Sequence, residues 1–127
     1  MRRYLWVGLA ALALCGARKI SAIHNVRPAD AEKLLAEGGV LLLDVRTTQE
    51  YQDGHIPNAR LMPITEFSKR LNELPSDKTQ PILVYCAAGV RSSQAAKILA
   101  RNGFKDIYNL TGGIRAWIAD LKSIQVK

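Results

Sequence analysis

The chain has 127 residues, of which 48% are apolar and 23% are charged, and its formal net charge is +7. This length suits one domain with a hydrophobic core, and the composition is that of an ordinary globular protein. The charge does not predict nucleic-acid binding, because no basic run exceeds two residues and acidic residues are interspersed. His24 and His55 stand apart from any cysteine, so the sequence predicts no metal site and no cofactor.

The first residues of the chain predict an export signal. Met1-Arg2-Arg3 is a basic start, and fourteen uncharged residues follow at positions 4–17. A membrane span needs about 20 apolar residues, so this run fits a signal peptide better, with small residues before a cleavage after Ala17. An uncleaved membrane anchor and a structural helix are the alternatives. We therefore expect residues 1–21 to be a signal peptide or anchor, residues 22–127 to form the domain, and the protein to be exported, in a bacterial periplasm.

Cleavage of this segment would leave Cys86 as the only cysteine and lower the net charge from +7 to +5, because two arginines are removed. One cysteine cannot form an internal disulfide, so stability must come from the core. Any group that becomes bound to Cys86 must leave to an external acceptor.

Apolar periodicity and turn residues then divide the remaining chain. They predict, in order, a helix over 28–37, a strand over 40–45, a polar corner over 47–59, a short strand near 60–62, a helix over 63–74, a strand over 82–85, a helix after Arg91, a strand over 107–110 and a helix after Gly113. Alternating strands and helices predict an α/β fold, with a mostly parallel sheet covered on both faces. The functional crevice of such a sheet lies beyond the carboxyl ends of its strands.

Cys86 lies at such a strand end, directly before a helix. The free backbone N–H groups and the dipole at a helix N-terminus favour an anion. Gly89 lets the turn curl tightly, and Arg91 adds a positive charge. Such surroundings lower the pKa of a thiol and make a thiolate nucleophile available at neutral pH. The alternative is a small buried cysteine with no chemical role.

Three motifs resemble those of the rhodanese family of sulfurtransferases. The first is Cys-x-x-Gly-x-Arg over 86–91, whose four residues between Cys and Arg form a narrower loop than the five of the related tyrosine phosphatases. The second is Asp-Val-Arg at 44–46, followed by Glu-Tyr and Gly-His-Ile-Pro. The third is Gly-Gly-x-x-Ala-Trp over 112–117. Together the resemblance covers roughly residues 22–122 and implies a rhodanese-like sheet of about five strands.

The resemblance also implies a function. Cys86 would take sulfane sulfur from a donor such as thiosulfate, hold it as a persulfide, and pass it to cyanide or a thiol, possibly one on a protein. The family places the substrate-binding loop at Ala87, Ala88, Gly89, Val90, Arg91 and Ser92. Arg91 would organise this loop or meet the anionic donor. Ala87 and Ala88 are uncharged where some members carry cationic or polar side chains, which leaves the donor open.

The supporting residues have two interpretations each. Asp44 and Arg46 either lie at the mouth of the Cys86 pocket or form an ion pair at a strand end. For His55 a structural role in its turn is favoured, and Asn58, where the family usually has Gly, can adopt a left-handed backbone.

Two alternative functions stay open. One is a phosphatase or arsenate reductase using the same thiolate, and the other is a non-catalytic binding or sensing module.

Overall fold

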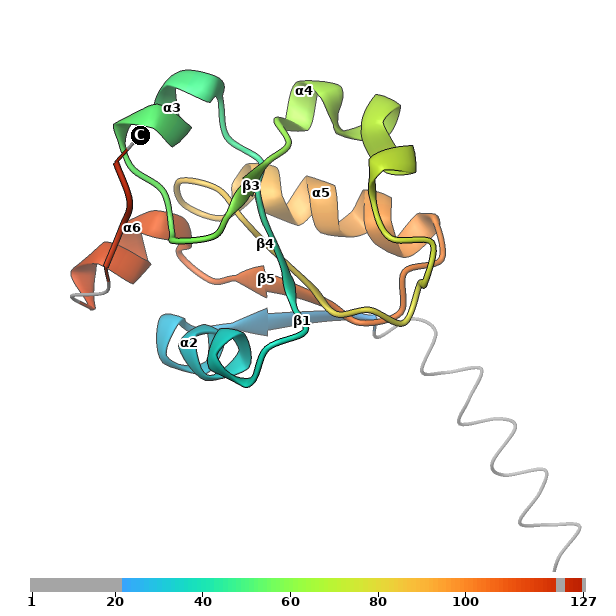
Figure 1. The fold of residues 1–127 in the computed structure, drawn as a ribbon, viewed down its shortest axis with the longest axis horizontal. Helices are drawn as coiled ribbons and strands as arrows, with labels where there is room; N and C mark the ends of the chain where they lie inside the picture. The colour runs from blue at the N-terminus through green and yellow to red at the C-terminus, as the bar shows by residue number, and fades with distance from the viewer. Residues whose placement is uncertain (1–21, 121–122, 127) are drawn as a thin grey trace, which may run out of the picture.

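The computed structural model describes residues 22–120 and 123–126, so the predictions for residues 1–21 lie outside the described residues. Its elements are β1 (Ile23–Val26), α2 (Pro28–Glu37), β2 (Leu41–Asp44), α3 (Thr48–Asp53), β3 (Arg60–Leu61), α4 (Ile64–Phe67), the 3-10 helix η2 (Ser68–Glu73), β4 (Ile82–Tyr85), α5 (Val90–Arg101), β5 (Ile107–Leu110) and α6 (Gly113–Ala119). Five parallel strands form one sheet in the order β1-β5-β4-β2-β3 (Figure 1). The predicted α/β fold is confirmed. None of the helices in the described part of the chain is long and apolar enough to cross a bilayer.

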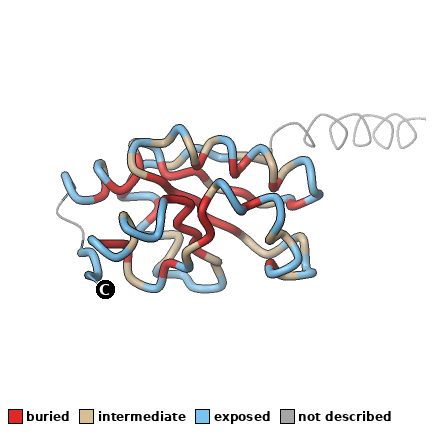
Figure 2. Tube along the Cα trace, turned by 90° about the horizontal axis from the view of Figure 1, so that it is seen from above, coloured by how far each residue is buried: buried red, intermediate tan, exposed pale blue. Residues whose placement is uncertain are grey.

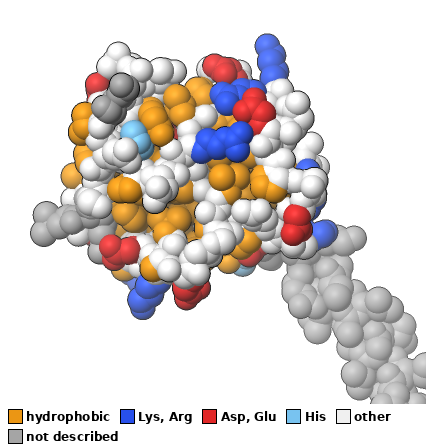
Figure 3. Space-filling model, in the orientation of Figure 1, with side chains coloured by type: hydrophobic (Ala, Val, Ile, Leu, Met, Phe, Trp, Pro, Cys, Tyr) orange, Lys and Arg blue, Asp and Glu red, His pale blue; other side chains and the backbone are white. Residues whose placement is uncertain are grey.

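The sheet has a separate hydrophobic core on each face, because neighbouring side chains along a strand point in opposite directions. Leu43 and Val84 pack on the face covered by α4 and α5, whereas Leu42 and Tyr85 pack on the face covered by α2 and α6. The central strand β4 is buried along its whole length. Figure 2 shows that buried residues concentrate in the middle of the molecule, with exposed residues around them. On the face seen in Figure 3, hydrophobic side chains are visible across the middle, and most charged side chains lie towards the margins. This two-layered core holds the carboxyl ends of the strands in fixed positions.

Three elements differ from the sequence prediction. The edge strand β1 was not predicted, because its two central residues are exposed and it shows neither an apolar run nor a strict alternation. Helix α3 lies inside the predicted polar corner and begins with a capping box between Thr47 and Glu50. The predicted helix over 63–74 is one α-helical turn that tightens into η2, and this tighter winding still places Leu71 and Leu74 against the core.

Candidate active site

Cys86 lies between the end of β4 and the start of α5, with only 1% of its surface exposed. The backbone N–H of Gly89 donates a hydrogen bond to Sγ at 3.0 Å. The hydroxyl Oγ of Ser92, in the first turn of α5, lies 3.4 Å from Sγ. When Cys86 is a thiolate it can only accept, so the Ser92 hydroxyl must then be the donor. The predicted meeting of Cys86 with a helix N-terminus is confirmed.

These contacts change the acidity of the thiol. Burial by itself would raise the pKa of Cys86, because it disfavours the charged form. Hydrogen bonds from the Ser92 side chain and backbone, and from the backbone of Gly89 and Ala88, outweigh burial and lower the pKa below the ordinary value. The site therefore favours a thiolate that is shielded from bulk water.

The first turn of α6 fixes the orientation of the Cys86 loop. The N–H groups of Ile114 and Arg115 donate to the carbonyl oxygens of Cys86 and Ala87, at 2.9 and 3.2 Å. In a trans peptide the C=O and the next N–H point in opposite directions, so these bonds turn the following N–H groups away from α6. Gly113 is required for this approach, because a Cβ there would lie 2.5 Å from backbone atoms of the loop. This close contact explains the second glycine of the Gly-Gly motif, and a Cβ at Gly112 would lie 2.7 Å from that of Ala116.

The rim of the loop carries no charge between Cys86 and Arg91. Gly89 has φ +114°, a left-handed conformation that favours glycine, and it caps the N-terminus of α5. Ala88 is exposed, and Val90 has 73% of its surface exposed. The exposed side chains of the loop next to the buried sulfur are therefore uncharged and apolar.

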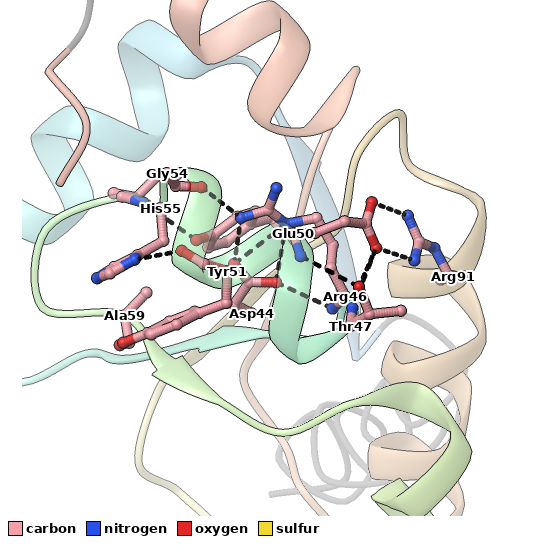
Figure 4. Close-up of polar contacts among 11 residues, drawn as sticks. Asp44, Arg46, Thr47, Glu50, Tyr51, Gly54, His55, Ala59 and Arg91 are labelled. Carbon is pink, nitrogen blue, oxygen red and sulfur yellow. Dashed lines mark hydrogen bonds and ion pairs between the residues drawn. The ribbon is translucent and has the colours of Figure 1, made fainter. Parts of the chain in front are cut away.

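Arg91 pairs with a residue that the sequence analysis did not assign to the site. Its Nη1 and Nη2 donate to the two carboxylate oxygens of Glu50 in α3, at 2.7 and 2.9 Å (Figure 4). The hydrogen bond from Arg91 is the main reason that the pKa of Glu50 falls to about 2. Glu50 also accepts from the backbone N–H of Thr47 at 3.0 Å, so it joins the cap of α3 to the Cys86 loop. Two sequence signals for Glu50 were available, namely the capping-box spacing Thr-x-x-Glu and its place in the Glu-Tyr part of the second motif.

Asp44 and Arg46 form a buried ion pair at the end of β2. Arg46 Nη2 donates to Asp44 Oδ2 at 2.6 Å and to the carbonyl oxygen of Gly54 at 2.8 Å. The guanidinium also lies over the ring of Tyr85, 5.6 Å from its centre. Tyr85 belongs to the core on the opposite face from Cys86, so the pair and the thiol share a sheet edge but not a face. These contacts match the strand-end interpretation, and a direct role at the mouth of the pocket stays a prediction.

The turn after α3 is held by packing and backbone bonds. The ring of His55 stacks on Tyr51 with 3.7 Å between centres, and its Nδ1 lies 2.8 Å from the carbonyl oxygen of Tyr51. Its backbone pairs with Gln125 near the C-terminus. Asn58 has φ +70°, which confirms the left-handed conformation predicted there. His55 therefore has the structural position that the sequence favoured (Figure 4).

The arrangement is suited to nucleophilic chemistry by a single thiolate. The hydrogen-bond donors of Gly89 and Ser92 converge on Sγ and stabilise a negative charge on it. Among the described residues, no group of three or more His, Cys, Asp or Glu side chains could hold a metal ion.

Comparison with known proteins points to one family. The family described as "Rhodanese-like domain" matches residues 27–120. Among solved structures, the crystal structure of a rhodanese-related protein from Thermoplasma volcanium aligns with a TM-score of 0.74 and 29% identity, over 82% of this chain and 99% of that one. The fold and the three sequence motifs thus lead to the same group of proteins.

Relatives with curated descriptions are similar over most of the described domain. The uncharacterized protein YqhL of Bacillus subtilis is 43% identical over 65% of this chain and 64% of its own length. A protein named sulfurtransferase from Allochromatium vinosum is 38% identical, over 68% of this chain and 79% of its own. Thiosulfate sulfurtransferase GlpE of Coxiella burnetii is 34% identical, over 71% and 82%. The alignment with YqhL therefore spans slightly less than two thirds of that relative.

Proposed function

Because this chain belongs to the rhodanese-like domain family, we propose that it is a sulfurtransferase that carries sulfane sulfur as a persulfide on Cys86. One observation carries the proposal: the thiol is almost fully buried, yet hydrogen bonds from the loop and Ser92 lower its pKa. Burial without these donors would give an inert thiol. Similarity to the two proteins named sulfurtransferases supports the same reaction class.

The proposed reaction has two displacement steps. The Cys86 thiolate attacks the outer sulfur of thiosulfate, the bond between the two sulfur atoms breaks, and sulfite leaves with the bonding electrons. Cys86 then carries a persulfide with one negative charge, which the hydrogen-bond donors of the loop stabilise. A thiolate or cyanide attacks the outer sulfur and restores the Cys86 thiolate. The acceptor thiol belongs either to a small molecule or to a partner protein.

Intact mass after mixing with thiosulfate tests the proposal. We expect the mass to rise by one sulfur atom, and cyanide to remove it with formation of thiocyanate. The variant Cys86→Ser is the matched control and should gain nothing. A protein that stays unmodified but hydrolyses a phosphoester or reduces arsenate would support the alternative enzymes. Failure in all three assays would support a non-catalytic module.

We also propose that the protein is exported, from the basic start and the apolar run in residues 1–17. The N-terminal sequence of protein isolated from its native host tests this point. A start near Arg18 is the expected result, and a start at Met1 in a membrane fraction would favour the uncleaved anchor.

A further inference from the structure

The site has a charge problem when its substrate is an anion. The nucleophile is a thiolate, and a donor such as thiosulfate carries two negative charges, so the two reactants repel each other. The residues between Cys86 and Arg91 are uncharged. Arg91 is already bound through two nitrogens to the carboxylate of Glu50, and the pair together has no net charge. Residues 86–91 therefore offer an anionic donor backbone N–H groups but no unpaired cationic side chain, so a cation from a neighbouring element would strengthen its binding.

Arg115 fits this role by position. It lies in the first turn of α6, and its backbone N–H donates to the carbonyl oxygen of Ala87, directly after Cys86. Side chains in a helix lean towards its N-terminus, which here abuts the Cys86 loop. The side chain of Arg115 thus starts from a residue that is hydrogen-bonded to the loop, and by this rule it leans in the direction of the loop.

Arg115 also fits by its surroundings. It is exposed, and within residues 22–120 and 123–126 no hydrogen bond or ion pair engages its guanidinium. By contrast, Arg46 is bound to Asp44, on the opposite face of the sheet. Arg101 is also exposed, but it lies at the far end of α5 from the Cys86 loop, whereas Arg115 lies in the turn of α6 that contacts the loop.

We propose that Arg115 binds the oxyanion end of an anionic sulfur donor and holds its outer sulfur towards Cys86. The inference rests on the proposed sulfurtransferase function and gives a role to Arg115, which occupies a variable position of the third sequence motif. Arg115 would set the affinity for the anionic sulfur donor. The N–H groups and hydroxyl of the loop would stabilise negative charge on the sulfur of Cys86.

The test compares the KM values of two sulfur donors that differ by one negative charge. Thiosulfate is a dianion, and methanethiosulfonate is a monoanion of similar shape that gives up the same outer sulfur and releases methanesulfinate. In Arg115→Gln we expect the KM for thiosulfate to rise about tenfold at low salt, the effect of one charge on a dianion about 6 Å away in water. The rise for methanethiosulfonate should be about threefold, because half the charge gives half the free energy. The kcat for both donors should change little.

Two further variants separate charge from structure. Arg115→Lys keeps the charge and should restore most of the affinity. Arg101→Gln removes an exposed arginine at the other end of α5, and it should leave both KM values unchanged. The difference between Arg115→Gln and the parent should shrink as salt rises, because the screening length falls from about 30 Å at 0.01 M to about 10 Å at 0.1 M.

Each outcome decides a separate question. Equal KM values in Arg115→Gln and Arg101→Gln would overturn the role of Arg115 while leaving sulfur transfer intact. A fall in kcat for both donors with unchanged KM would also overturn it, since it would indicate a distorted loop. If the parent protein forms no persulfide with either donor, the proposed function itself is wrong, and the role of Arg115 fails with it.

Discussion

The structure holds one arginine–carboxylate pair at the end of β2 and another between α3 and α5, and the two pairs differ chiefly in exposure. The side chains of Asp44 and Arg46 are 0% and 7% exposed, and they join β2 to the turn at Gly54. The side chains of Glu50 and Arg91 are 33% and 32% exposed, and they join α3 to the Cys86 loop. A buried pair is costly to break, because the remaining charge has neither partner nor water. A part-exposed pair adds little to stability. The first pair therefore serves the fold, and the second serves the geometry of the site.

The largest effect should come from breaking the buried pair. Arg46→Met leaves the Asp44 carboxylate buried without its partner, and we expect the free energy of unfolding to fall by about 3–5 kcal/mol. Urea denaturation measures this change. Arg60→Gln is the matched control, because it breaks a surface pair with Glu73 and should cost about 0–1 kcal/mol. Equal losses in the two variants would remove the contrast between buried and exposed pairs.

Breaking the second pair should instead affect activity. In Arg91→Met the loop loses both hydrogen bonds to Glu50 in α3. If the transition state loses the equivalent of one charged hydrogen bond, about 1.5–3 kcal/mol, kcat should fall ten- to hundredfold. The fall should be the same for thiosulfate and methanethiosulfonate, unlike the KM effect expected for Arg115. The stability loss should stay below about 1 kcal/mol.

A double-mutant cycle with Glu50→Gln identifies the partner of Arg91. If the pair acts as a unit, the double variant should be no slower than Arg91→Met alone. Additive losses would show that Arg91 acts on the loop without Glu50. A change confined to the KM for thiosulfate would instead assign donor binding to Arg91.

A smaller effect is expected inside the loop, where no ion pair acts. Ser92→Ala removes the hydroxyl near Sγ, so the pKa of Cys86 should rise and alkylation by iodoacetamide at neutral pH should slow several-fold. In the parent, the alkylation rate should level off at lower pH than for a free cysteine, near 8.5. Ser93→Ala is the neighbouring control. Identical profiles for the parent and Ser92→Ala would exclude the hydroxyl as a source of the lowered pKa.

The smallest effect concerns acid stability. Arg91 lowers the pKa of Glu50 from 4.5 to about 2, so the folded state binds this proton less readily than the unfolded state. The resulting stability is fully present above about pH 4.5 and is lost as the pH falls towards 2. Solvent screening of this part-exposed pair limits it to about 1 kcal/mol. Glu50→Gln should therefore show a shallower loss of stability than the parent between these pH values, and parallel curves would contradict the assignment.

The sequence by itself determined the fold class and the position of the nucleophile. Short apolar runs such as 82–85 predict buried strands because strands of a covered parallel sheet are apolar on both faces. Cys86 and Gly89 could be placed on a strand-to-helix turn because the change from strand to helix periodicity is local. For the same reason, the left-handed conformation of Asn58 could be predicted.

Contacts between distant segments were decided only by the tertiary structure. Arg91 and Glu50 are separated by 41 positions, and no periodicity links α3 to α5. The same holds for Arg115, which meets Ala87 only because α6 packs its first turn against the loop at Gly113. Cys86 and the Asp44–Arg46 pair lie on opposite faces of the sheet because of the register between β2 and β4, which the amino-acid sequence alone does not show. Local patterns fix what a segment becomes, but pairing partners follow from how the segments pack.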